Sequence, residues 1–239
     1  MNITLIGYGK MGKEVENAAL ERGHNISLII DINNLNDLDS EAFKSSDVAI
    51  EFTSPSSVIG NLYKCFEADV PVVTGSTGWH DQMDKISRDC KAGNHTLFYA
   101  SNFSIGVNIF FALNKYLADI MNSFPQYDVS VEEIHHTQKL DAPSGTAITI
   151  ANIISDILER KTTWKKAGAD QNNNDIPIKS IREGDIKGIH EVLYDSDLDY
   201  IKLEHFAKSR KGFAQGAVLA AEYSHNRKGI LNMRDLLGI

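Results

Sequence analysis

Apolar runs of strand length alternate with longer amphipathic segments through the first hundred residues. The segment from Lys10 to Arg22 has helical spacing and ends at Gly23, a residue that suits the close of a helix. A second helix is expected after the polar stretch at 53–57. The predicted strands occupy 2–6, 25–31, 47–52, 70–75 and 96–100. Strands separated by helices predict a parallel, doubly wound sheet.

The pattern changes beyond the fifth predicted strand. Over 105–121, apolar residues recur every three or four positions, which predicts a helix with one apolar stripe. A strand is expected at 127–134. A further helix is expected over about 146–160, with Ser144 or Gly145 near its N-cap.

Segment 161–175 is polar and is expected to form a mobile loop. Three strand-like segments follow at 176–183, 189–196 and 200–207. The short turns between them predict antiparallel pairing. From Ala214 the chain returns to helical character, and we expect this tail to pack on the first domain.

These elements predict an α/β protein in which an N-terminal Rossmann-like, doubly wound parallel sheet is interrupted by an inserted α+β domain. We expect a dinucleotide-binding domain over 1–103 that is completed by 212–239. The inserted domain spans 104–211 and is expected to bind the substrate.

Composition narrows the class of protein. The chain has 239 residues, of which 42% are hydrophobic and 23% charged, as in an ordinary globular protein. Its formal net charge of −8 argues against partners such as nucleic acid or an anionic membrane. No apolar run reaches membrane-spanning length and no secretory signal is visible, so a cytoplasmic protein is expected. Cys65 and Cys90 form neither a disulfide framework nor a metal-binding spacing, and we expect reduced, structural thiols.

A glycine-rich loop follows the first predicted strand and consists of Gly7, Tyr8, Gly9, Lys10, Met11 and Gly12. Gly7 permits a tight turn, Gly9 lets a pyrophosphate approach the backbone, and Gly12 allows close packing of helix on strand. The phosphates then lie at a helix N-terminus, where free N–H groups and the helix dipole favour anions. This context indicates a dinucleotide site, and the alternative is a plain glycine-rich turn.

Asp31 ends the second predicted strand, ~20 residues beyond the glycine loop, where an acid binds the ribose 2′-hydroxyl. Its carboxylate would repel the 2′-phosphate of NADPH, and Ile32 follows it instead of a basic residue. We therefore expect NADH to be preferred, while Lys10 lies close enough in sequence to leave NADPH open. Two further loops, 75–79 and 100–103, follow predicted strands at the edge where open α/β sheets bind ligands.

A second cluster lies at 132–150, EEIHHTQKLDAPSGTAITI, where His135, His136 and Lys139 precede Ser-Gly-Thr at 144–146. Histidine titrates near neutrality, and lysine offers a positive charge or a proton. Ser-Gly-Thr at a helix start offers N–H groups and hydroxyls to a carboxylate. These parts suit a small dicarboxylate whose reduction needs a proton as well as a hydride.

Two other interpretations of this cluster are weaker. We expect no metal, because adjacent histidines at a strand end point in different directions and no third ligand has a zinc spacing. Packing alone would let Pro143 stop a turn and Ser144 cap a helix, which explains these residues singly but not their grouping.

The run EIHHTQKLDAPSGTA resembles the signature of the dihydrodipicolinate reductase family, also called 4-hydroxy-tetrahydrodipicolinate reductases, of bacterial lysine and diaminopimelate synthesis. Motifs of the form HHxxKxDAPSGTA are highly specific. The resemblance covers nearly the whole chain, because the glycine loop, GSTGW, ASNFSIGVN, REGDIKGIHEV and the late SR…FAQGA fall in the expected order. It implies NADH- or NADPH-dependent reduction of a cyclic imine dicarboxylate by a homotetramer that assembles through the sheet of the second domain.

The resemblance also implies roles by position. His135 matches the catalytic acid/base and Lys139 the proton donor, and which of the two protonates the substrate is left open. The residues that would hold the dicarboxylate are His136, Lys139, Ser144, Gly145 and Thr146. The residues that would contact the coenzyme are the glycine loop, Asp31, Gly75, Ser76, Thr77, Ala100, Ser101, Asn102 and Phe103.

The chain departs from the family pattern in three places, all on the coenzyme side. The glycine loop is one residue shorter with Lys10 in place of an arginine, Ile32 replaces a frequent basic residue, and segment 31–47 is short. These departures bear on the choice of coenzyme and not on the reaction. Two alternatives stay open: an aspartate-dehydrogenase-like enzyme, which would not need the Ser-Gly-Thr cradle, and a nucleotide-sensing regulatory protein without a proton donor in its pocket.

Overall fold

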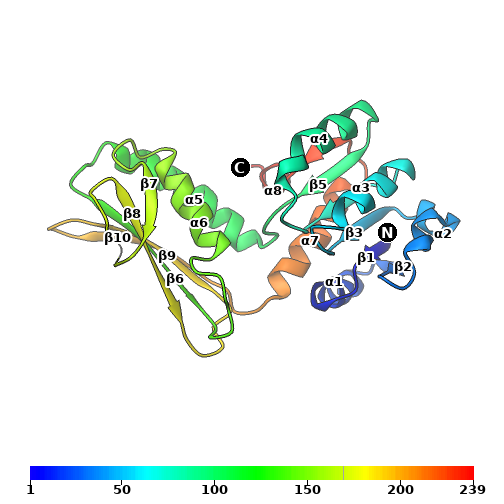
Figure 1. The fold of residues 1–239 in the computed structure, drawn as a ribbon, viewed down its shortest axis with the longest axis horizontal. Helices are drawn as coiled ribbons and strands as arrows, with labels where there is room; N and C mark the ends of the chain where they lie inside the picture. The colour runs from blue at the N-terminus through cyan, green and yellow to red at the C-terminus, as the bar shows by residue number, and fades with distance from the viewer. Residues whose placement is uncertain (169) are drawn as a thin grey trace. The chain divides into compact units, whose positions relative to one another are not determined.

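The computed structural model describes residues 1–168 and 170–239. These residues form two compact units (Figure 1). The first unit consists of Met1–Ile105 and Lys211–Ile239, and the second of Gly106–Arg210. The first unit is therefore discontinuous in sequence, and its last elements follow the completed second unit.

The first unit contains a six-stranded parallel sheet with the strand order β11-β5-β4-β3-β1-β2. Its strands are β1 (Asn2–Ile6), β2 (Asn25–Ile30), β3 (Val48–Glu51), β4 (Val72–Thr74), β5 (Thr96–Tyr99) and β11 (Gly229–Leu231). The five predicted strands are confirmed. The strand β11 was not predicted, because it has only three residues and lies in a tail whose apolar pattern is helical.

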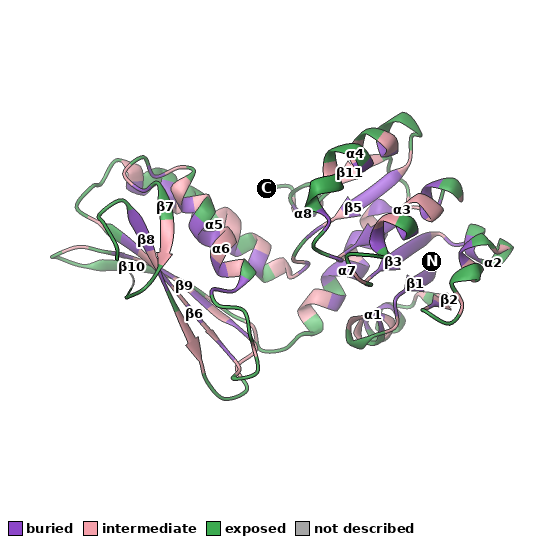
Figure 2. Cartoon of the chain, in the orientation of Figure 1, coloured by how far each residue is buried: buried purple, intermediate pink, exposed green. Residues whose placement is uncertain are grey.

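Helices cover both faces of this sheet, and its central strands β1, β3, β4 and β5 are largely buried, whereas the edge strand β2 is partly exposed (Figure 2). Successive residues of β1 alternate between the two cores: Ile3 and Leu5 belong to one core and Ile6 to the other. The first core includes α1 (Lys10–Glu21), α7 (Lys211–Ser224) and α8 (Met233–Leu237). The second core includes α2 (Glu41–Lys44), α3 (Val58–Glu67) and α4 (Met83–Ala92). The short 3₁₀ helices are η1 (Leu35–Asp39) and η2 (His80–Gln82).

The second unit is built on a mixed sheet with the strand order β10-β9-β6-β8-β7. Its elements are α5 (Ile105–Asn122), β6 (Asp128–His135), α6 (Gly145–Ser155), β7 (Thr163–Lys166), β8 (Asp175–Arg182), β9 (Ile189–Asp195) and β10 (Tyr200–Phe206). One face of the sheet packs on the two helices, where Val131, Ile178 and Val192 meet Phe110 of α5 and Ile150 of α6 (Figure 1). The doubly wound sheet and the α+β unit together confirm the predicted fold class.

Two details of this unit differ from the prediction. The strand β9 is antiparallel to β6 and β10, but β8 lies parallel to β6, between β6 and β7. The chain passes through α6 between β6 and β8, and such a crossover produces parallel strands. The helix α6 ends at Ser155, short of the predicted end, and beyond it Arg160 donates to the carbonyl oxygens of Met121 in α5 and of Tyr127 just before β6.

The polar segment 161–175 was predicted to be a mobile loop, but it contains β7, which pairs with β8. The buried Lys161 closes the segment, because its ammonium group donates to the carbonyl oxygens of Asn173 at 2.8 Å and Asp175 at 3.1 Å. Residue 169 lies outside the described residues.

The two thiols, Cys65 and Cys90, are free and buried, as expected of structural cysteines. Over residues 1–168 and 170–239, no helix has the length and apolar character needed to cross a membrane.

Candidate active site

The predicted coenzyme residues gather along one edge of the parallel sheet. Because all six strands run in the same direction, the segments that follow them lie at the same edge. The glycine loop follows β1, Asp31 follows β2, and the segments 75–77 and 100–103 follow β4 and β5. The chain reverses its winding between β1 and β3, and this switch point is where open α/β sheets bind nucleotides.

The glycine loop is shaped by two positions that only glycine can occupy. Gly7 has a φ of 91°, and a Cβ there would lie 2.2 Å from the carbonyl oxygen of Phe52. A Cβ at Gly12 would lie 2.3 Å from the carbonyl oxygen of Gly7. At Gly9, in contrast, a Cβ would have no atom of the described residues within 4 Å. Folding does not require glycine there, and the open space is the kind that a pyrophosphate fills.

The helix α1 begins directly after this open position, with Gly9 as its N-cap. Within the described part of the chain, no side chain caps the helix and its first turn carries no acidic residue. Lys10 and Met11 begin the helix, and Tyr8 donates a hydrogen bond to Glu16 in its second turn. Uncapped N–H groups and the helix dipole make this end suitable for the diphosphate of a dinucleotide.

Asp31 lies directly after β2 in a tight turn. Its Oδ1 accepts a hydrogen bond from the backbone N–H of Ile32 at 2.9 Å, and its own N–H donates to the side chain of Asn34 at 2.8 Å. The Oδ2 atom takes no part in either bond. The neighbouring Ile32 is 80% exposed, so an apolar side chain occupies the position next to the acid.

A buried carboxylate, Glu51, organises the loops after β3 and β4. It accepts hydrogen bonds from the hydroxyls of Thr53, Thr74 and Ser76. The N–H of Thr53 also donates to Oγ of Ser76 at 2.8 Å, which joins the two loops directly. The indole of Trp79 donates to the carbonyl of Ser76 at 2.7 Å. Glu51 was not identified from the sequence, where it is one acid at the end of an apolar run.

Aromatic rings pack against the backbone of the two later loops. A Cβ at Gly75 would lie 2.1 Å from the ring of Phe52, and that ring stands edge-on to Phe103 with centroids 5.8 Å apart. A Cβ at Gly216 of α7 would lie 1.8 Å from the carbonyl oxygen of Phe103. The other predicted coenzyme contacts in these loops lie at the surface or just beneath it: Thr77, Ala100, Ser101 and Asn102.

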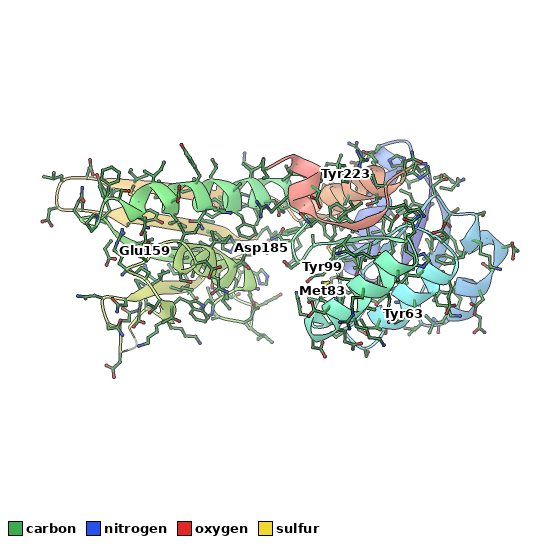
Figure 3. All side chains as sticks on the ribbon, turned by 90° about the horizontal axis from the view of Figure 1, so that it is seen from above. Tyr63, Met83, Tyr99, Glu159, Asp185 and Tyr223 are labelled. Carbon is green, nitrogen blue, oxygen red and sulfur yellow. The ribbon has the colours of Figure 1, made fainter. Side chains whose placement is uncertain are left out.

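Tyr99, labelled in Figure 3, joins the end of β5 to the segment after β4. Its hydroxyl lies 2.6 Å from Nε2 of His80, and its ring stands edge-on to Trp79 at 5.1 Å. Burial raises the pKa of Tyr99 above its ordinary value, so the hydroxyl keeps its proton. The segment after β4 is therefore held by Glu51 through Ser76 and by Tyr99 through His80.

In the second unit, His135 ends β6 and is buried. Its Nδ1–H donates to Oε2 of Glu133, a fully buried residue two positions earlier on the same strand face. The other oxygen, Oε1, accepts from Nη2 of Arg182 at 2.9 Å and from the N–H of Ser144 at 3.3 Å. Burial alone would raise the pKa of Glu133, but the bonds from His135 and Arg182 outweigh it and lower the pKa to about 2.

Ser144 is the N-cap of α6, which confirms one of the two predicted positions. Its Oγ accepts from the N–H of Ala147 at 3.2 Å and lies 3.2 Å from Nε2 of His190. Gly145 and Thr146 form the first turn and are at least partly exposed. Because the first N–H groups of a helix lack partners within it, this turn can hold a carboxylate.

His190 is the cross-strand partner of Glu133, and its ring stands edge-on to His135 with centroids 5.1 Å apart. Burial lowers the pKa of His190 to about 3, so the ring is neutral. Gly188 precedes it with a φ of 154°, and a Cβ there would lie 3.1 Å from Nε2 of His135. Glycine therefore leaves room beside Nε2, the ring atom that Glu133 does not engage.

Arg182 holds the loop 136–143 by its backbone. Its Nε donates to the carbonyl oxygen of Lys139 at 3.3 Å, and its Nη2 donates to that of Asp141 at 2.5 Å as well as to Glu133. The ammonium group of Lys139 lies 2.8 Å from Oδ1 of Asp141. Burial would raise the pKa of Asp141, but the hydrogen bond from Lys139 prevails and lowers it.

His136 lies beside a cation that the sequence did not single out. Its N–H donates to the carbonyl of Ile186 at 2.7 Å, in the β8–β9 loop that also contains Asp185 (Figure 3). Its Nε2 accepts from Nη2 of Arg210 at 3.3 Å. Partial burial and the charge of Arg210 lower the pKa of His136. At neutral pH His136 is therefore an uncharged hydrogen-bonding group, and Arg210 supplies the positive charge.

The second unit thus brings the predicted catalytic and substrate residues into one region, together with four that were missed: Glu133, Arg182, His190 and Arg210. All four lie within or beside the runs that carry the family resemblance. Their residue types were visible in the sequence, but only the pairing of β8 and β9 with β6 shows which of them meet.

The prediction of no metal considered only the adjacent pair His135 and His136, whereas the structure brings a different set of possible ligands together. Ligand atoms of Glu133, His135 and His190 lie within 4.8 Å of one another, and the third comes from another strand, which spacing along the chain does not reveal. Both oxygens of Glu133 are already engaged, so a cation at this point would compete with the guanidinium of Arg182.

A doubly wound sheet with a glycine loop at its switch point, joined to a unit with a buried His–Glu pair beside a helix start, defines a pyridine-nucleotide-dependent oxidoreductase. The family model described as "Dihydrodipicolinate reductase, N-terminus" matches residues 1–103, and "Dihydrodipicolinate reductase, C-terminus" matches residues 106–237. The chain belongs to the dihydrodipicolinate reductase family.

Its relatives agree with this assignment. A 4-hydroxy-tetrahydrodipicolinate reductase of Christiangramia forsetii is 45% identical over 237 residues, which cover 99% of this chain and 98% of the relative. One of Neisseria meningitidis is 34% identical over 94% of this chain and 84% of the relative. A dipicolinate-bound dihydrodipicolinate reductase from Paenisporosarcina has the same fold, with a TM-score of 0.78 at 23% identity over 98% of both chains. The sensor and aspartate-dehydrogenase-like alternatives are not favoured.

Proposed function

We propose that this chain reduces 4-hydroxy-tetrahydrodipicolinate, a cyclic imine dicarboxylate, to tetrahydrodipicolinate in the biosynthesis of lysine and diaminopimelate. The observation that carries the proposal is the buried His135–Glu133 pair beside the Ser144-capped start of α6, with Lys139 on the connecting loop. A proton carrier, an anion-binding helix start and a fixed cation are the parts that this reaction needs. The reductases named above support the same substrate.

The roles of the residues follow from their surroundings. A bound reduced nicotinamide supplies the hydride. The glycine loop and the start of α1 hold the diphosphate, and the first turn of α6 holds a substrate carboxylate with help from Lys139 and His136. His135 or Lys139 delivers the proton. The exposed Ile32 beside Asp31 supports NADH as the preferred coenzyme over NADPH.

The first test is a direct assay with freshly generated substrate, in which NADH or NADPH oxidation is followed by absorbance. We expect oxidation by the wild type, and a loss of about 10²–10⁴-fold in His135→Gln and Lys139→Ala. Two controls are matched in chemistry: His225→Gln, and Lys44→Ala, whose ammonium pairs with Glu41 at 2.8 Å as Lys139 does with Asp141. A wild type that binds NADH but leaves it unoxidised would overturn the proposal in favour of a sensor or another substrate.

We also propose a cytoplasmic homotetramer that assembles through the sheet face opposite α5 and α6. An apolar row crosses four neighbouring strands in register on that face: Ile181, Ile134, Ile189 and Phe206. Phe206 is 51% exposed. Light scattering is expected to give the mass of four chains, and Ile189→Glu is expected to dissociate them. The control Leu198→Glu, at a residue 94% exposed in the β9–β10 turn, should remain tetrameric.

A further inference from the structure

We propose that Glu133 is a positioning residue for the proton transfer: it orients His135 so that Nε2 is the atom that exchanges a proton with the substrate, and it couples that ring to the start of α6. The inference rests on the proposed reduction. One of the two measurements that test it, the tautomer of His135, does not depend on activity.

The first step concerns the ring of His135. An ionised carboxylate only accepts hydrogen bonds, so Glu133 places the hydrogen of the neutral ring on Nδ1. Nε2 then carries the lone pair, and it lies on the side where Gly188 has no side chain. When Nε2 takes up a proton, the positive ring remains against the carboxylate, which stabilises it. Such a partner sets both the tautomer and the orientation of a catalytic histidine.

The second step concerns the other oxygen of the same carboxylate. Oε1 accepts from the N–H of Ser144 at 3.3 Å and from Arg182 at 2.9 Å. One buried group therefore fixes the proton-carrying ring and the first residue of the helix start that would hold the substrate. Arg182 keeps this group ionised, and it also binds the carbonyls on either side of Leu140.

This arrangement makes Glu133→Gln a sharp test. Two donors converge on the Oε1 position, so the amide oxygen of a glutamine must lie there. The amide NH₂ then faces Nδ1 of His135, which can only accept from it. The hydrogen of the neutral ring must move to Nε2, so the variant inverts the tautomer while it keeps the contacts to Ser144 and Arg182.

The experiment combines kinetics with ¹⁵N NMR of the histidine rings, assigned with His135→Gln. We expect Glu133→Gln to lower kcat by about 10²–10⁴-fold with KM changed by less than about threefold, and to shift the ring hydrogen of His135 from Nδ1 to Nε2. The matched control is Glu222→Gln, because Glu222 also accepts from an arginine and a histidine, Arg22 and His24, within the first unit. It should retain both activity and the His135 tautomer.

Glu133→Asp provides a second variant that keeps a carboxylate for Arg182 but is one methylene shorter. We expect an intermediate loss of kcat with the wild-type tautomer in part restored. An unchanged tautomer in Glu133→Gln, or a kcat within about threefold of wild type, would overturn the inference. A wild type without reductase activity would instead overturn the proposed function, and the NMR measurement would still decide whether Glu133 orients the ring.

Discussion

Glu133 and His190 are direct cross-strand partners on β6 and β9, and one is held charged while the other is held neutral. The carboxylate has hydrogen bonds from His135 and Arg182 that favour its ionised form. The imidazole of His190 is buried and has Ser144 as its hydrogen-bonding neighbour. The protonation of each residue makes the stability of the second unit depend on pH, over a different pH range for each.

His190→Gln should flatten the acid side of the stability profile. The pKa of His190 is about 3 in the folded chain against an ordinary value of 6.5, so the unfolded chain takes up the proton first. The stability it contributes is complete above pH 6.5 and is lost as the pH falls toward 3. Wild-type unfolding free energy should fall in this window by up to about 1.4 kcal/mol per pH unit. Urea titrations between pH 7 and 4 measure this slope, and a variant with the wild-type slope would contradict the prediction.

Gly9→Ala and Gly7→Ala should separate coenzyme binding from folding. At Gly9 a methyl group meets no described protein atom, so we expect an unchanged Tm and NADH binding weakened about tenfold by obstruction of the diphosphate. At Gly7 the positive φ and the contact with Phe52 should destabilise the fold by at least about 1–3 kcal/mol. Thermal unfolding and NADH fluorescence titration test the pair. Unweakened NADH binding by folded Gly9→Ala would argue against this loop as the diphosphate site.

Gly188→Ala should impair catalysis by obstruction of Nε2 of His135. The added methyl group would lie 3.1 Å from that atom, and we expect kcat/KM to fall about tenfold or more. Gly184→Ala in the same loop is the control, because its φ of 48° imposes backbone strain while its Cβ would meet no described atom within 4 Å. Equal losses in the two variants would assign the effect to loop strain.

Ile32→Arg should move the coenzyme preference toward NADPH. The exposed position beside Asp31 would then carry a guanidinium that can pair with a 2′-phosphate. We expect the ratio of kcat/KM for NADPH over NADH to rise about tenfold, and further when Asp31→Ser removes the repelling carboxylate. Steady-state kinetics with both coenzymes measure the ratio, and an unchanged ratio would place the 2′-position elsewhere.

Helices, strands and caps that depend on local pattern were predicted from the sequence, but the pairing of strands far apart in the chain was not. Five parallel strands, the helix over 105–121 and the cap at Ser144 follow from apolar spacing and residue type. The parallel pairing of β8 with β6 did not, because short turns favour antiparallel neighbours and the crossover through α6 decides otherwise. That pairing brings Arg182 to Glu133, and the pairing of β9 with β6 brings His190 there, so the support of the site was missed together with the strand order.

Arg182 holds the loop 136–143 by hydrogen bonds to main-chain carbonyl oxygens, which every amino acid supplies. The shape of the loop is thus independent of what side chain stands between the two bonded positions, and Leu140 there is 97% exposed. A cysteine introduced at this position could carry a fluorophore within one residue of Lys139 while the loop keeps its course. Because the backbone contacts hold the loop, a fluorophore at position 140 would report the binding of a ligand beside Lys139.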